Sequence, residues 1–232
     1  RPMLYGSDLD DMMTTPRRRS RGAALAGALT SVMLLALSAC DTAPAGGGTA
    51  SGQQLYQLCA QCHGENGLGN RFANTPAIAG LPAWYVEAQL LKFRSGQRGS
   101  HPDDLTGMQM RPIARTLTSD ADIKTIAEHV SAMPRFRPEP QIKDANPARG
   151  SALYKPCAAC HGANGEGNEG TKAPPLQAQS DWYVATQLTH FRKGIRGTHP
   201  EDATGGMMRP QAVMLPDDAA VRDVAAFIAQ AK

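Results

Sequence analysis

The sequence predicts an all-α protein made of two tandem domains, and three observations lead to this prediction. A gapless repeat, offset by the 98 residues that separate Cys59 from Cys157, runs through the chain after about residue 50. Each copy carries apolar side chains at the three- and four-residue spacing of a helix. No stretch alternates apolar and polar residues as a strand does. A period this long indicates duplication of a whole domain, because stacked short repeats have periods of about 20 to 50 residues.

Three main helices are expected in each copy. The first covers about residues 50–61 and 147–159, and Asn146 followed by Pro147 is typical of a helix start. The second and third are indicated by apolar triplets on one helical face, with Ser119 and Asp217 as N-caps of the third. These triplets are Val86, Leu90 and Phe93; Ile123, Ile126 and Val130; Val184, Leu188 and Phe191; and Val221, Val224 and Ile228. We therefore expect domains at 51–134 and 147–232, joined by a proline-containing linker at 135–146.

The N-terminal residues 1–39 read as an export signal. Four arginines precede the apolar run 22–37, which at about 16 residues is short for a membrane span, although a single anchor helix is the alternative. The run ends in Leu37-Ser38-Ala39-Cys40, which resembles a bacterial lipobox. This resemblance implies that Cys40 is lipidated and that residues 40–50 tether the protein to the periplasmic side of the inner membrane.

Charge gives little support to nucleic-acid binding. The formal net charge is +3, and five of the arginines lie within the first 39 residues, so the remainder is close to neutral. No basic stripe with interleaved aromatic residues is present.

Four of the five cysteines lie in two Cys-x-x-Cys-His motifs. These are Cys59, Cys62 and His63 in the first repeat and Cys157, Cys160 and His161 in the second. This spacing is that of covalent haem attachment, in which two thiols bond one porphyrin and the following imidazole binds its iron. A zinc site and a thioredoxin-like redox pair are the alternatives. A histidine directly after both pairs, in an exported chain, favours two haem c groups.

Met110 and Met208 are the candidates for the second axial iron ligand. Each follows its motif histidine by 47 residues in the shared context Met-Arg-Pro-x-Ala, in what is expected to be a loop before the third helix. The neighbouring Met108 and Met207 are not duplicated. The alternatives are that the paired methionines only fill the core, or that His101 and His199, which are also paired, bind the iron. His129 and His190 are unpaired and are expected at ordinary helix positions.

Each half, with these motifs, resembles a class I cytochrome c, and the tandem resembles the dihaem cytochrome c4 group over Gly52 to Lys232. The resemblance implies His/Met ligation of both irons, and two domains related by a pseudo-twofold with haem propionates near their interface. It also implies that two prolines support the motif histidines and that paired tryptophans and arginines lie near the haem edges. These residues are Pro76, Pro174, Trp84, Trp182, Arg98 and Arg196.

A haem iron with both axial positions filled changes oxidation state without binding substrate, so we expect an electron carrier and not an enzyme. Methionine ligation raises the reduction potential. The expected partners are a respiratory donor and, downstream, a terminal oxidase or reductase. One alternative is the electron-accepting subunit of a periplasmic dehydrogenase. Two further alternatives are a dihaem peroxidase and a gas sensor, each of which needs an iron with a vacant ligand position. The near identity of the two halves argues against a peroxidase.

Overall fold

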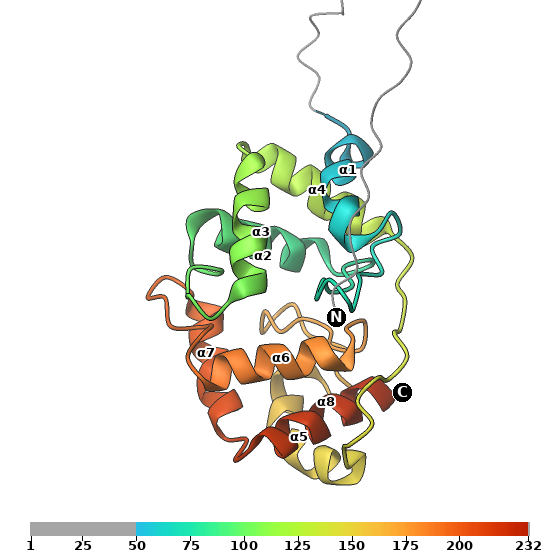
Figure 1. The fold of residues 1–232 in the computed structure, drawn as a ribbon, viewed down its shortest axis with the longest axis vertical. Coiled ribbons are helices and arrows are strands. Elements are labelled where there is room, and N and C mark those ends of the chain that lie inside the picture. Colours follow the sequence, from blue (N-terminus) through green and yellow to red (C-terminus); the bar gives the residue numbers. More distant parts are fainter. Residues whose placement is uncertain (1–49, 232) are drawn as a thin grey trace, which may run out of the picture. The chain divides into compact units, whose positions relative to one another are not determined.

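The computed structural model describes residues 50–231, which lie within one compact unit (Figure 1). The expected signal peptide, Cys40 and most of the tether lie outside the described residues. Eight helices follow one another in the described part, with two isolated β-bridges and no longer strand. They are α1 (Gly52–His63), α2 (Ala83–Ser95), α3 (Leu105–Thr116), α4 (Asp120–Ala132), α5 (Pro147–His161), α6 (Asp181–Arg192), α7 (Ala203–Val213) and α8 (Asp218–Gln230). The all-α prediction is confirmed.

Helix starts follow local capping chemistry. Ser119 caps α4 and Asp217 caps α8, each accepting a hydrogen bond from a backbone amide three residues on. Asn146 caps α5 with Pro147 in the first turn, and Ser51 and Gln54 form a capping box at α1. Such side chains satisfy amides that have no partner within the helix. The N-caps predicted from the sequence are therefore confirmed.

Each repeat has a fourth helix that the sequence did not predict. α3 and α7 occupy the segments expected to be loops, and each contains a glycine in its first turn and a proline, Pro112 or Pro210, in its interior. Asp104 and Asp202 cap them by accepting from the amides of Gly107 and Gly205. Glycine and proline disfavour helix in isolation, so packing against α2 and α6 must offset this cost.

The two repeats have matching cores. Aromatic and aliphatic side chains of α1, α2 and α4 meet in the first repeat, and those of α5, α6 and α8 meet in the second. Burying one such side chain contributes about 1.5–3 kcal/mol. α5 crosses α8 closely, because a Cβ on Gly150 would lie 2.0 Å from the carbonyl oxygen of Asp223. Larger side chains at this position would force the helices apart.

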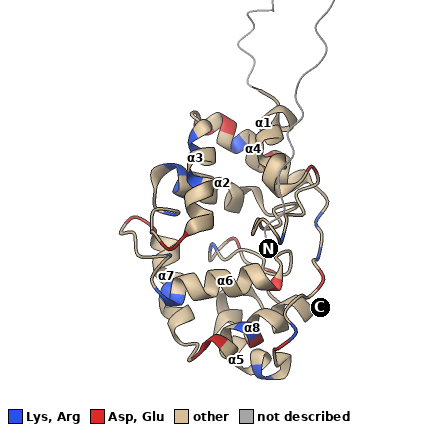
Figure 2. Cartoon of the chain, in the orientation of Figure 1, with Lys and Arg blue, Asp and Glu red and all other residues tan. Residues whose placement is uncertain are grey.

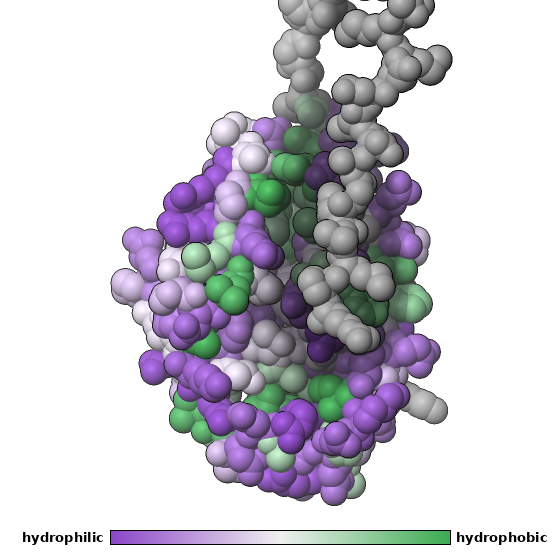
Figure 3. All heavy atoms as spheres, in the orientation of Figure 1, coloured by the Kyte–Doolittle hydropathy of each residue, from purple (hydrophilic) through white to green (hydrophobic). Residues whose placement is uncertain are grey.

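On the face of residues 50–231 that Figure 2 draws, charged residues do not gather into a basic stripe. Figure 2 shows both signs distributed over the two repeats on the face drawn, and Figure 3 shows hydrophobic residues in small groups among hydrophilic ones. Between residues 50 and 231, no helix has both the length and the apolar character needed to cross a membrane.

Candidate functional site

A large apolar pocket lies among the four helices of the first repeat, and Gln179 and Tyr183 of the second repeat complete its lining. The space between the lining atoms, counted together with the part of the pocket that is open to solvent, is about 1310 Å³. Cys59, Cys62 and His63 line it from α1, Met110 and Ile113 from α3, and Leu90, Phe93, Ile126 and Val130 from α2 and α4. The motif and the candidate methionine, far apart in sequence, therefore border the same cavity.

The motif cysteines are unpaired thiols on the last turns of α1 and α5. Cys62 and Cys160 are exposed, whereas Cys59 and Cys157 are partly buried. Burial raises the pKa of the Cys59 thiol to about 11 and raises that of Cys157 in the same direction. Catalytic redox cysteines need a lowered pKa, so this environment argues against a thioredoxin-like pair.

The motif histidines are buried and held by backbone carbonyls. Nδ1 of His63 lies 2.9 Å from the carbonyl oxygen of Pro76, and Nδ1 of His161 lies 2.9 Å from that of Pro174. Burial lowers the pKa of both imidazoles, against the opposing effect of these hydrogen bonds. A neutral ring that donates through Nδ1 leaves the lone pair of Nε2 free for a metal.

Tyr56 and Tyr154 also hold the motifs, a role that sequence reasoning missed. Their hydroxyls donate to the carbonyls of Gly64 and Gly162, directly after the motif histidines, at 2.7 and 2.9 Å. Burial raises the pKa of Tyr56 to about 12, so its hydroxyl keeps the proton it donates. The two tyrosines occupy equivalent positions in the two repeats, and this repetition is the sequence feature from which their role could have been predicted.

The alternative axial ligands lie away from the pocket. Met108 is 47% exposed and Met207 is 59% exposed, whereas Met110 and Met208 pack against the two cores. His101 and His199 accept backbone hydrogen bonds from Asp103 and Glu201 through Nδ1. Neither Met108 nor His101 lines the pocket of the first repeat.

Arg98 and Arg196 are buried side by side where the repeats meet. Arg98 donates to Gln89 of its own repeat and to Gln187 and Tyr183 of the other, at 2.8–3.0 Å. Arg196 reciprocally donates to Gln187 at 2.6 Å and to Gln89 at 2.9 Å. Reciprocal contacts of this kind are those that a twofold axis produces.

The arginine pair fits an anionic cofactor. Nε of each guanidinium is buried without a hydrogen-bond partner, and the hydrogen-bonded partners of both groups are neutral. Buried cations are normally paired with anions. Arg98 lines the pocket of the first repeat, so the carboxylates of a haem bound there would supply the missing negative charge.

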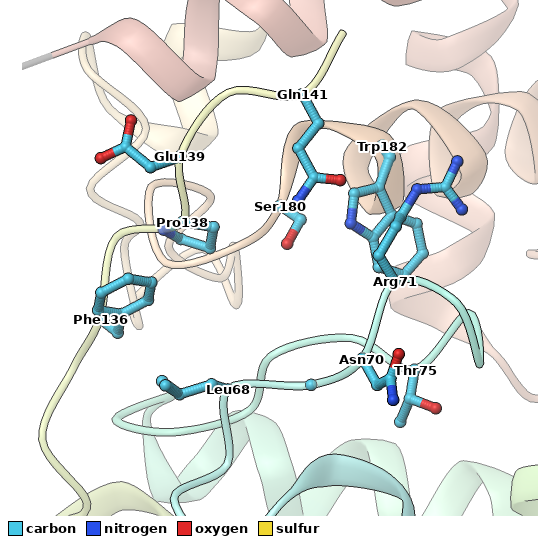
Figure 4. A pocket seen from close by; sticks show the side chains of 11 residues that line it. Leu68, Asn70, Arg71, Thr75, Phe136, Pro138, Glu139, Gln141, Ser180 and Trp182 are labelled. Carbon is cyan, nitrogen blue, oxygen red and sulfur yellow. The ribbon is translucent and has the colours of Figure 1, made fainter.

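The two tryptophans lie at the junction of the repeats. Trp84 is not among the residues that line the pocket, and its ring lies under the ammonium group of Lys172 at 5.5 Å. Trp182 lies under the guanidinium of Arg71 at 4.8 Å and borders a separate polar cleft (Figure 4). Each cation comes from the other repeat, so these pairs join the two halves.

Residues 49–134 and 147–232 each match the cytochrome c family. The chain is 30% identical over 209 residues to cytochrome c4 of Azotobacter vinelandii, an alignment that covers 84% of this chain and 93% of that protein. This chain belongs to the dihaem cytochrome c4 family. The reduced cytochrome c4 of Pseudomonas stutzeri superposes with a TM-score of 0.63 at 27% identity, over 78% of this chain and 97% of that one.

A second kind of relative is a thiosulfate dehydrogenase electron acceptor from Stutzerimonas stutzeri. It is 35% identical over 179 residues, covering 69% of this chain and 79% of that protein. Two cytochrome c domains with a Cys-x-x-Cys-His motif in each imply two covalently bound haems. As a cytochrome c4-like protein, the chain is an electron carrier and is not itself catalytic.

Proposed function

We propose that this dihaem cytochrome carries electrons through two irons that are each bound by histidine and methionine. His63 and Met110 serve the first haem, His161 and Met208 the second, and Cys59, Cys62, Cys157 and Cys160 form the thioether bonds. The observation that carries the proposal is that Met110 borders the same apolar pocket as Cys59, Cys62 and His63.

Each group has a distinct task in this proposal. When bound, the haem supplies a one-electron redox centre. The carbonyls of Pro76 and Pro174 orient the histidines, which fixes the tautomer that offers Nε2. With haem bound, Met110 and Met208 would each offer a thioether sulfur to the iron of their own repeat, and a thioether ligand favours the reduced state. Arg98 and Arg196 hold the haem carboxylates at the junction of the repeats.

The proposed route runs from a respiratory donor to a terminal oxidase or reductase. The relative that is a thiosulfate dehydrogenase electron acceptor favours a second candidate, in which the chain receives electrons as a subunit of a periplasmic dehydrogenase. Isolation of the native complex and identification of the co-purifying proteins would distinguish the respiratory carrier from the dehydrogenase subunit. A stable dehydrogenase partner would establish the second.

We also propose that residues 1–39 are removed and that a lipid on Cys40 holds the protein at the periplasmic side of the inner membrane. The Leu-Ser-Ala-Cys sequence supports this, and it accounts for the one cysteine outside the haem motifs. Residues 40–50 would then tether the domains at 51–134 and 147–232, with 135–146 as the linker.

Replacing Met110 with Ala tests the axial assignment. The variant should keep two covalent haems by mass spectrometry, lose about half of the near-infrared band of methionine-bound ferric iron, and bind carbon monoxide when reduced. Met208→Ala should do the same at the other haem, and Met108→Ala is the matched control on the same helix. A band that survives in both Met110→Ala and Met208→Ala would show that these residues are not the ligands.

A further inference from the structure

Two ionic contacts join the repeats at equivalent places, and they differ in chemistry. Lys92 in α2 donates to the carboxylate of Asp202, the N-cap of α7, and to the hydroxyl of Thr204. At the equivalent place in the second repeat stands His190, whose Nδ1 lies 3.6 Å from Oδ1 of Asp104, the N-cap of α3. Each half thus contacts the N-terminus of the helix that carries the other half's methionine.

The two contacts are equally enclosed. Lys92 and His190 side chains are both 13% exposed, and their aspartate partners are 1% and 5% exposed. Because Asp104 caps α3 through the amide of Gly107, a change of charge beside it acts on the start of that helix. Met110 follows six residues later, about 9 Å along the helix axis.

The two contacts place different titratable groups beside equivalent aspartates. Nδ1 of His190 is buried and has no hydrogen-bond partner, although it faces a carboxylate. A lysine ordinarily titrates near 10.4, far from the pH range in which histidine changes charge. Burial lowers the pKa of Lys92, while the hydrogen bond to Asp202 opposes this.

The charged groups that face His190 come from both repeats. Burial lowers its pKa below the ordinary 6.5, Asp104 opposes this, and Arg98, Arg196 and His101 lower it further. The folded protein therefore binds this proton less readily than the unfolded chain. The free energy of unfolding should decrease as the pH falls from 6.5 towards the lowered pKa.

We propose that His190 and Lys92 are positioning residues that act across the junction on the methionine helices α3 and α7, and that His190 makes the first haem more sensitive to protons than the second. This rests on the proposed axial ligation. A proton on His190 adds positive charge near the start of α3 and completes the ion pair with Asp104. Positive charge favours the reduced state, so the midpoint potential of the first haem should rise as the pH falls.

The test compares wild type, His190→Gln and Lys92→His, all haem-loaded, by potentiometry between about pH 5 and pH 8. The two haems are distinguished by the axial methionine resonance that Met110→Ala or Met208→Ala removes. In wild type the potential of the first haem should rise more steeply with acidification than that of the second. His190→Gln should remove this excess, and Lys92→His should give the second haem a matching rise.

An independent readout is the pH titration of the His190 ring proton by NMR. Asp104→Asn keeps a side chain that can cap α3 and should lower the His190 pKa, because the opposing carboxylate charge is gone. If His190→Gln leaves the difference between the two pH profiles unchanged, the positioning role is refuted. A failure of the axial assignment would instead appear as an unchanged near-infrared band in Met110→Ala and Met208→Ala.

Discussion

Tyr56 and Tyr154 act on the single residue that follows each motif histidine. Their hydroxyls satisfy the carbonyls of Gly64 and Gly162, both of which lie at helix C-caps with φ near +80°. A carbonyl at a helix end has no partner within the helix. Each tyrosine therefore stabilises the turn that ends the motif, and with it the orientation of the histidine.

Tyr56→Phe should destabilise the first domain by about 1–2 kcal/mol, because it removes one hydrogen bond and leaves a partly buried carbonyl unsatisfied. Tyr154→Phe should have a similar effect on the second domain. Guanidinium unfolding followed at the haem absorbance measures both. Equal stability of wild type and both variants would show that the hydroxyls contribute nothing to the motif turn.

At the scale of the elements, Asp181 fixes the path of the linker before α5. Its buried carboxylate accepts hydrogen bonds from the amides of Gln141 and Ile142 in the linker and from that of Trp182 in α6. The equivalent residue of the first repeat is Ala83, where no linker has to be held. This carboxylate is therefore specific to the second repeat.

Asp181→Ala should destabilise the protein by about 3 kcal/mol, since it strips the linker amides of a charged acceptor. The control is Asp120→Ala, which removes the exposed partner of Arg94 and should cost about 1 kcal/mol or less. Denaturant midpoints of the two variants provide the comparison. If Asp181→Ala cost no more than Asp120→Ala, the linker would not depend on this carboxylate.

At the scale of the whole molecule, the two halves meet through reciprocal contacts and yet are not equivalent. The arginines and glutamines exchange hydrogen bonds symmetrically, whereas Lys92 and His190 give the two sides different charge behaviour. The symmetric contacts follow from the duplication of the domain. The proton-sensitive contact that we propose follows from a difference at one pair of equivalent positions, Lys92 and His190.

The attachment of the whole protein is tested at Cys40. Cys40→Ala should release the protein from membranes into the periplasmic fraction, because the acyl chains provide the anchor and a run of about 16 apolar residues is short for a span. Cell fractionation and immunoblotting measure this, with wild type as the reference. Undiminished membrane association of the variant would rule out the lipid anchor.

Local chemistry could be predicted from the sequence alone. The domain duplication is visible as a repeat at a constant offset of 98 residues. The two haem-attachment motifs and the N-caps at Ser119, Asn146 and Asp217 each depend on residues close together in the chain. The spacing of nearby residues is sufficient to predict these features. Haem attachment depends on the covalent reach of two neighbouring cysteines, and an N-cap depends on backbone amides within one helical turn.

Only the tertiary structure decided what depends on distant packing. α3 and α7 form despite Gly107, Pro112 and their counterparts, because contacts with α2 and α6 outweigh weak helix propensity. The same packing separates the enclosed Met110 from the exposed Met108, and it places Trp84 beneath Lys172 of the other repeat instead of along the pocket. The meeting of His190 with Asp104 likewise arises only when the two halves fold against each other, since no local pattern records a partner in another domain.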